Sequence, residues 1–375
     1  MPIGADTTFA ERLDKAGIDY SAGYPEVPPK PKTVKLAKRA ETWEHQDPAA
    51  RADPQKKALF GAAKEVITLT PNIGTEIVGL QLSQLTDQQK DELALLIAER
   101  VVVFFRDQDL SPQDQVALGA YFGKVEVHPS AARVSGLPGC TVVSDEFANY
   151  SGHKTDFRNP FGTQNWHTDL THETQPPGIT HLHIDAAPTF GGDTCWASGY
   201  TAYDKLSPEF QRIIESLEGI YRSDDYYEDP EDPTAPKKPI TSYHPLVRTH
   251  PVTGWKSLFA NRRYTIGIKG MTQTDSSVIL QRCFDVFDGP FALENMVRFR
   301  WTPRTSALWD NRVSIHAAVY DYQDDATEPR HGTRVSSLAE KPYLDPKSKG
   351  RREALGLDMG HLDELGGGNP FRGSR

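Results

Sequence analysis

Apolar and polar residues alternate through the stretch 65–82, and a turn of Pro, Asn, Ile and Gly divides it near the middle. Alternation places every second side chain on one face of an extended strand, so this stretch predicts a β-hairpin. The period then becomes helical: Thr86 is a candidate N-cap, and Leu93 and Ile97 fall on one helical face. We expect this helix to lead into an apolar strand over residues 101–105.

A second helix is predicted after Ser207, a candidate N-cap that is followed by Pro208. Apolar residues recur at helical spacing from Phe210 to Leu217, and Gly219 is expected to end the helix. Most of the remaining chain consists of short β-like runs separated by turns, without an internal repeat. This pattern predicts an α+β fold, mainly β, built around a β-sandwich or a jelly roll.

The composition changes near residue 64. Residues 1–64 are rich in Pro, Lys, Glu and Ala and show no lasting hydrophobic period, so they are predicted to form an extended N-terminal arm. The compact domain is expected over residues 65–345, and residues 346–375 are expected to form a C-terminal tail.

Charge and composition narrow the class of protein. The 375 residues carry a formal net charge of −9 and no block of Lys and Arg, so a nucleic-acid partner is not expected. The start of the chain does not resemble a secretory signal, and no run of about 18 apolar residues predicts a membrane span. The three widely spaced cysteines are expected to be reduced thiols, which indicates a cytoplasmic protein: Cys140, Cys195 and Cys283.

A possible metal site begins with His167 and Asp169, in the stretch NWHTDLTHET. Residues two apart on a strand point to the same face, so this pair can present an imidazole and a carboxylate to one ion. The pair alone is more typical of a polar strand face than of a metal site. His316, which follows a Trp-Asp-Asn-Arg turn, is the best candidate for a third ligand. Two His and one carboxylate form the facial triad of non-haem Fe(II) oxygenases, with coordination positions left open for chemistry.

Two arginines follow at a distance that suits an anion clamp. Arg330 and Arg334 lie 14 and 18 residues beyond His316. An arginine at such a position can hold the distant carboxylate of a 2-oxo acid that chelates the iron. His181 and His183 share a strand face and are a rival metal pair, but no third ligand is near them in the sequence. We expect those two to be solvated surface histidines.

Several longer stretches extend the pattern of the triad. They include VVVFFRDQDLSPQDQVALGAYFGKVEVHP, NWHTDLTHETQPPG, APTFGGDTCWASGYTAYDKLSP and HGTRVSSLAEKPY. Through these stretches, in this order, the chain resembles the taurine/sulfonate dioxygenase family of Fe(II)- and 2-oxoglutarate-dependent oxygenases, and it is most similar to fungal-type members. The resemblance implies a double-stranded β-helix (jelly roll) core with flanking helices, and it covers most of residues 65–343.

The resemblance also implies roles for individual residues. His167, Asp169 and His316 match the iron ligands of the family. Thr194 and Arg330 match the residues that hold 2-oxoglutarate. The positions that bind the sulfonate of taurine correspond to His128 and Arg334, and Asn165 is expected to shape the pocket wall beside the triad.

Three positions depart from the taurine enzymes. Ala131 stands in place of a Tyr, Thr163 in place of an Asn, and His172 in place of a Phe. These changes are expected to enlarge the substrate pocket and to make one wall polar. Taurine itself is therefore not the expected substrate.

The implied reaction consumes O₂ and 2-oxoglutarate and oxidises a C–H bond of a small anionic substrate, with succinate and CO₂ as coproducts. Hydroxylation next to a sulfonate would release sulfite and an aldehyde. A second hypothesis is the same chemistry on a carboxylate or an amino-acid-derived metabolite, as hydroxylation, desaturation or cyclisation. A third is a non-catalytic binding or scaffold protein that retains the fold. A homo-oligomer, either a dimer or a tetramer, is expected by analogy.

Overall fold

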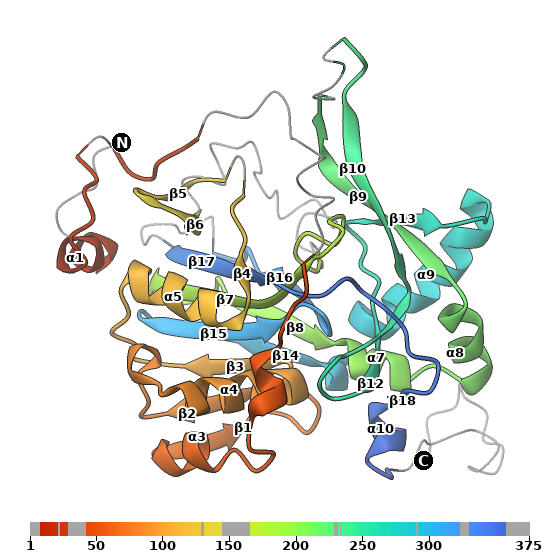
Figure 1. The fold of residues 1–375 in the computed structure, drawn as a ribbon, viewed down its shortest axis with the longest axis horizontal. Helices are drawn as coiled ribbons and strands as arrows, with labels where there is room; N and C mark the ends of the chain where they lie inside the picture. The colour runs from red at the N-terminus through yellow and green to blue at the C-terminus, as the bar shows by residue number, and fades with distance from the viewer. Residues whose placement is uncertain are drawn as a thin grey trace.

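The computed structural model describes residues 8–21, 23–28, 43–128, 131–144, 166–228, 232, 234–289, 292–322 and 330–357. Its dominant element is a nine-stranded sheet in the order β1-β2-β3-β15-β7-β17-β6-β5, with β4 paired to β17 (Figure 1). The strands are β1 (Glu65–Thr68), β2 (Thr75–Val78), β3 (Val102–Phe105), β4 (Lys124–Val125), β5 (Arg133–Val134), β6 (Leu137–Ser144), β7 (Pro177–Ala186), β15 (Thr305–Asp310) and β17 (His331–Leu338).

Three smaller sheets accompany this large one. The sheet β14-β8-β16 contains β14 (Met296–Phe299), β8 (Thr194–Ser198) and β16 (Ser314–Ala318). The sheet β10-β9-β13 contains β9 (Glu218–Tyr227), β10 (Lys238–Pro245) and β13 (Thr265–Ile268). The sheet β11-β12-β18 contains β11 (Val247–Thr249), β12 (Trp255–Leu258) and β18 (Lys349–Gly350).

The helices surround these sheets. They are α1 (Thr8–Lys15), α3 (Lys57–Ala62), α4 (Asp87–Arg100), α5 (Pro112–Phe122), α7 (Gly199–Asp204), α8 (Pro208–Glu215), α9 (Gln273–Asp288) and α10 (Arg351–Ala354). Short 3-10 turns are η1 (Pro48–Arg51), η2 (Leu82–Gln84) and η3 (Leu293–Asn295). None of the helices in the described part of the chain combines the length and the hydropathy needed to cross a membrane.

The predicted local elements are found where the sequence signals placed them. The hairpin β1–β2 pairs Glu65 with Val78, and Thr86 caps α4 in a capping box with Gln89. Ser207 caps α8, which begins with a proline as expected. That helix ends at Glu215, earlier than Gly219, because Ser216 is its C-cap and β9 then begins at Glu218.

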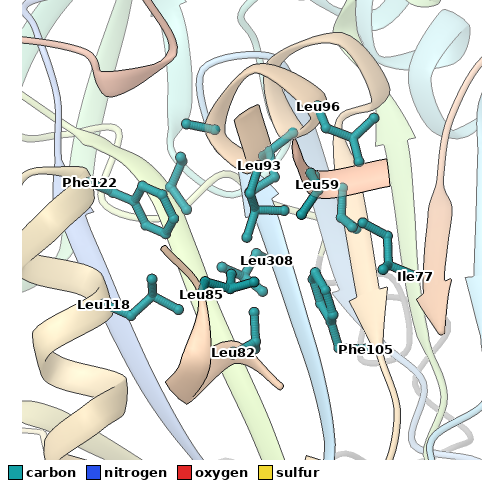
Figure 2. Packing of buried hydrophobic residues seen from close by; sticks show 14 of the residues in the cluster. Leu59, Ile77, Leu82, Leu85, Leu93, Leu96, Phe105, Leu118, Phe122 and Leu308 are labelled. Atoms are coloured by element: carbon teal, nitrogen blue, oxygen red, sulfur yellow. The ribbon is translucent and has the colours of Figure 1, made fainter. Parts of the chain in front are cut away.

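The two faces of the large sheet have different partners. On one face, Val103, Phe105 and Leu308 pack against Leu93 of α4 and Leu118 of α5 (Figure 2). The opposite face packs against the β14-β8-β16 sheet. That second core contains Phe104, Leu182, Ala307 and Trp309 from the large sheet, with Trp196, Val297 and Phe299 from the smaller one. Side chains alternate along each strand of the large sheet, so its two faces contribute to two separate cores. The candidate site lies on the side of the second core.

The segment 1–64, predicted to be an extended arm, includes three short helical pieces among its described residues: α1, η1 and α3. Leu13 of α1 and Leu59 of α3 are buried against the domain. Apolar burial therefore orders these pieces, although the composition of the segment as a whole is polar. Within the predicted C-terminal tail, β18 pairs in parallel with β12 and is followed by α10.

Candidate metal and cosubstrate site

Donor atoms of His167, Asp169 and His316 lie within 4.8 Å of one another. The Oδ1 atom of Asp169 is 3.6 Å from His167 Nε2 and 3.9 Å from His316 Nε2. The two imidazole centroids are 4.3 Å apart. The fold thus brings together, across 149 residues of chain, the three residues that the sequence selected as metal ligands.

Backbone pairing places the two histidines. His316 is on β16, and its N–H donates to the carbonyl of His167 over 2.8 Å, while the N–H of His167 donates back over 3.0 Å. The two residues form an isolated antiparallel bridge, so their side chains leave the backbone on the same side. The ring of Trp309 lies 4.8 Å from that of His316 and covers it from the core.

Asp169 is held from two further directions. Its backbone N–H donates to Asn311 Oδ1 over 3.2 Å, and its Oδ2 accepts from the Thr180 hydroxyl over 3.3 Å. Asn311 also donates to Thr180 Oγ1 over 2.8 Å. Asn311 and Thr180 therefore fix both the backbone and the carboxylate of Asp169. Neither residue was predicted to belong to the site, because neither is one of the two His and one carboxylate that form the facial triad.

The protonation states suit metal binding. Burial by itself raises the pKa of Asp169, but the Arg334 guanidinium and the His316 and His167 imidazoles outweigh it and hold that pKa far below its usual value. Burial, together with the neighbouring His167, lowers the pKa of His316 to about 3. At neutral pH the triad therefore offers an ionised carboxylate and a neutral imidazole of His316.

The donor set matches a divalent transition metal. Two imidazole nitrogens and one carboxylate oxygen converge here, and this set suits Fe(II) when coordination positions stay open. His316 Nδ1 is buried without a hydrogen-bond partner among the described residues. The observed donors therefore fit the iron that the sequence predicted.

Thr194 and Arg330, predicted to hold the cosubstrate, meet around the turn that precedes β8. Arg330 is buried, and its Nε donates to the carbonyl of Gly192 over 3.1 Å. Gly192 has a φ of +68°, and a Cβ there would meet Arg330 Cδ at 3.4 Å. The Thr194 hydroxyl oxygen accepts a hydrogen bond from Trp301 Nε1 over 2.9 Å. Arg330 is thus bonded to the turn two residues before Thr194.

Arg334, the predicted substrate anchor, joins the triad directly. It lies on β17 opposite Leu182 of β7, and its Nη1 is 3.1 Å from Asp169 Oδ1. Its side chain is 26% exposed, so it is accessible to a ligand as well as paired with the carboxylate.

The other predicted substrate residues are placed as follows. His128 is partly buried, and its Nδ1 accepts a hydrogen bond from the backbone N–H of Ala131 over 3.0 Å. His172 is buried, with its ring 5.2 Å from that of Tyr264. Tyr264 also meets the His167 ring, edge to face at 6.4 Å, and had not been singled out in the sequence. Asn165 and Thr163 lie outside the described residues.

The expectation for His181 and His183 was wrong in one respect. Both are buried, not solvated, and both ring systems bond to the Ser306 hydroxyl, at 3.0 and 2.9 Å. They are buried because β7 is an interior strand of the large sheet. Side chains alternate along β7, and Thr180 points to the triad, so the odd-numbered His181 and His183 point to the opposite face. The three cysteines are free thiols, as expected.

Comparisons with known proteins agree with this geometry. The family described as "Taurine catabolism dioxygenase TauD, TfdA family" matches residues 65–336. The chain belongs to this family. The family recognised from the sequence motifs is therefore confirmed, including its similarity to fungal members.

Individual relatives come from fungi and bacteria. An alpha-ketoglutarate-dependent sulfonate dioxygenase of Saccharomyces cerevisiae is 34% identical over 323 residues, covering 82% of this chain and 76% of the relative. The alpha-ketoglutarate-dependent dioxygenase cnsP of Penicillium expansum is 35% identical over 355 residues, covering 90% of this chain and 92% of the relative. The crystal structure of a taurine dioxygenase from Burkholderia xenovorans matches with a TM-score of 0.62 and 29% identity, covering 76% of this chain and 93% of that one.

Proposed function

We propose that this dioxygenase-family protein uses Fe(II) and 2-oxoglutarate to oxidise a C–H bond of a small anionic substrate, with an alkyl sulfonate as the substrate class. The observation that carries the proposal is the position of Arg334, whose partly exposed guanidinium lies beside Asp169 of the triad. A sulfonate bound there would hold its neighbouring carbon close to the metal. The sulfonate dioxygenase of Saccharomyces cerevisiae, similar over most of this chain, supports the same substrate class.

The protein's residues would divide the work. His167, Asp169 and His316 would hold the iron, and Arg330 with Thr194 would hold the distal carboxylate of 2-oxoglutarate. When bound, the iron and cosubstrate supply the oxidising power, because O₂ reduction is coupled to decarboxylation to succinate and CO₂. Arg334, with His128, would select which C–H bond faces the metal. Hydroxylation of the carbon that carries the sulfonate gives an α-hydroxysulfonate, which breaks down to an aldehyde and sulfite.

The architecture is part of the proposal. We take the large sheet and the β14-β8-β16 sheet as the two faces of a double-stranded β-helix, because they share one core and both contribute to the triad region. The catalytic domain is assigned to residues 65–345. A cytoplasmic location and a dimeric or tetrameric assembly stay predictions.

The test is sulfite release from a panel of linear alkyl sulfonates, measured beside succinate formation, with Arg334→Gln as the variant. We expect sulfite and succinate in equal amounts with at least one sulfonate, and a loss of roughly tenfold or more in kcat/KM in the variant, because a charge-assisted anion contact is removed. Iron affinity of the variant, measured separately, shows whether Asp169 can still bind the metal without its Arg334 partner. A panel that yields no sulfite would overturn the sulfonate assignment.

One observation favours a second substrate class. His172 is buried beside Tyr264 and makes this part of the site more polar than a Phe would. A carboxylate or an amino-acid-derived metabolite would suit such a wall. Substrate-dependent succinate without sulfite would indicate this alternative, whereas no turnover with either class would return the non-catalytic scaffold hypothesis.

A further inference from the structure

Two consecutive arginines between β12 and β13 point to different partners. Arg262 binds Asp288 and Asp285 of α9, with Nε 2.7 Å from Asp288 Oδ2 and Nη2 3.4 Å from Asp285 Oδ1. Its guanidinium also lies over the Phe284 ring. Both Nε and Nη2 of Arg262 therefore bond carboxylates of one helix, which is the pattern of a structural ion pair.

Arg263 turns toward the candidate site. Its guanidinium lies over the Tyr264 ring at 5.2 Å, and that ring contacts the rings of His167 and His172. Its side chain is 28% exposed, so solvent or a ligand can reach it. An arginine stacked on the aromatic ring that borders a metal ligand lies within reach of a molecule bound at the triad.

The electrostatics agree with this placement. Burial by itself would lower the pKa of Arg263, but Tyr264, Asp224 and Asp169 together raise it. Tyr264 is thus among the groups that stabilise the Arg263 charge, in line with the stacking of the two side chains.

Arg263 is only partly satisfied within the protein. Its Nε donates to Asp224 Oδ2 over 2.7 Å, and this is its only hydrogen bond among the described residues. Asp224 lies on β9 and its side chain is 55% exposed. A guanidinium has five N–H donors, so four of those on Arg263 have no hydrogen-bond partner among the described residues and can meet a ligand.

We propose that Arg263 is a second anion-recognition residue and that the preferred substrate carries two acidic groups, one held at Arg334 and the other at Arg263. This inference rests on the proposed function and names the substrate class more narrowly: a sulfonate that bears a second anionic group, such as a carboxylate, at the far end of a short chain. Asp224 holds Arg263 in place and weakens anion binding through its own negative charge.

The test is equilibrium binding, so that turnover is not needed. Calorimetric titrations under anaerobic conditions, with Fe(II) and 2-oxoglutarate present, compare 4-sulfobutanoate with pentane-1-sulfonate. A second matched pair, adipate and hexanoate, carries no sulfonate. In each ligand pair that binds, we expect the dianion to bind roughly tenfold or more tightly than the monoanion, because one charge-assisted contact is added.

Three variants separate the roles. Arg263→Gln should abolish the preference for the dianion while leaving pentane-1-sulfonate affinity nearly unchanged. Arg262→Gln, the adjacent arginine bound to α9, is the matched control and should keep the preference. Asp224→Asn should strengthen dianion binding a few-fold, since a competing negative charge is removed.

The outcomes distinguish this inference from the proposed function. Equal binding of both sulfonates, unaffected by Arg263→Gln, would overturn the second anion site and leave the sulfonate proposal standing. Binding of adipate alone, dependent on Arg263, would overturn the sulfonate head group and support the second anion site. An equal loss for the dianion and the monoanion in Arg263→Gln would also overturn the inference, because it would mean a general structural role.

Discussion

The indole N–H of Trp301 donates to the Thr194 hydroxyl oxygen over 2.9 Å, in a region where both side chains are buried. With one lone pair of Thr194 Oγ1 engaged, its own proton is directed to another acceptor. A carboxylate oxygen of 2-oxoglutarate would be that acceptor in the proposed function. In the proposed function, Trp301 would therefore position the cosubstrate through Thr194, in addition to its place in the core.

We expect Trp301→Phe to raise the KM for 2-oxoglutarate about threefold to tenfold, since a neutral hydrogen bond contributes roughly 1 kcal/mol. Iron affinity should not change, because the triad is untouched. Steady-state succinate formation with varied 2-oxoglutarate measures the effect, and a metal titration of the same variant is the control. An unchanged KM for 2-oxoglutarate would show that the rotamer of Thr194 does not depend on this bond.

Asn311 is predicted to control metal affinity although it does not touch the metal. Asn311→Ala removes the acceptor for the Asp169 N–H and the donor to Thr180 Oγ1. Loss of such an outer contact typically weakens metal binding by about tenfold to 100-fold. Anaerobic Fe(II) titration checks this expectation.

The matched control for Asn311 is Asn295→Ala. Asn295 is equally buried, but its amide donates to the Val286 carbonyl, away from the triad. The Asn295→Ala variant should have a lower free energy of unfolding but an unchanged affinity for iron. If both variants bind iron alike, Asn311 is only a structural residue.

Helix α1 is predicted to be fixed to the domain by one buried arginine. Arg12 bonds Asp185, Thr333 and Gln115, and the Arg12–Asp185 pair is almost fully buried. Arg12→Ala would leave the Asp185 carboxylate without its main cation, which costs about 3 kcal/mol. Urea unfolding measures the loss.

Lys15→Ala tests the same helix at an exposed ion pair. The Lys15–Asp109 pair has both side chains about two-thirds exposed, so its removal should cost less than about 1 kcal/mol. Equal effects of Lys15→Ala and Arg12→Ala would contradict the anchoring role. Faster proteolysis near the N-terminus in Arg12→Ala alone would support it.

Asp204 makes a distinctive contribution to the pH dependence of stability. Burial raises its pKa to about 6, although the backbone N–H of Arg352 and the Arg351 charge act in the opposite direction. Between pH 3.8 and about 6, the Asp204 carboxyl is therefore protonated in the folded state but already ionised in the unfolded state, where its pKa is 3.8. The stability from Asp204 is fully present below pH 3.8 and is lost as the pH rises to about 6.

Asp204→Asn should remove this fall in stability and raise the free energy of unfolding at pH 7 relative to the wild type. Urea unfolding at pH 4.5, 5.5 and 7 measures the difference between the two proteins. The gap should widen from the lowest to the highest of these pH values. A constant gap would mean that Asp204 is ionised throughout.

The local elements and the candidate ligands were predictable because their signals are local. Thr86 and Ser207 mark helix starts through side-chain bonds to backbone groups three residues away, and alternation marks the β1–β2 hairpin. His167 and Asp169 are two apart in a stretch that the sequence predicts to be extended, and that spacing made them a candidate pair. His316 was chosen as the third ligand from its place after the Trp-Asp-Asn-Arg turn, and the family motifs supported that choice.

Only the tertiary structure decided which distant side chains meet. Trp301 reaches Thr194 across 107 residues, and Arg12 reaches Asp185 across 173. The neighbours Arg262 and Arg263 are identical in type, yet one binds α9 and the other stacks on Tyr264, whose ring contacts His167. His181 and His183 were predicted at the surface and are buried. For His181 and His183 the reason is strand geometry: the period of a strand fixes which residues share a face, but strand order and register in the sheet fix what that face meets. For the arginines and Trp301 the reason is the packing of helices and connecting segments against the sheets, which local sequence does not encode.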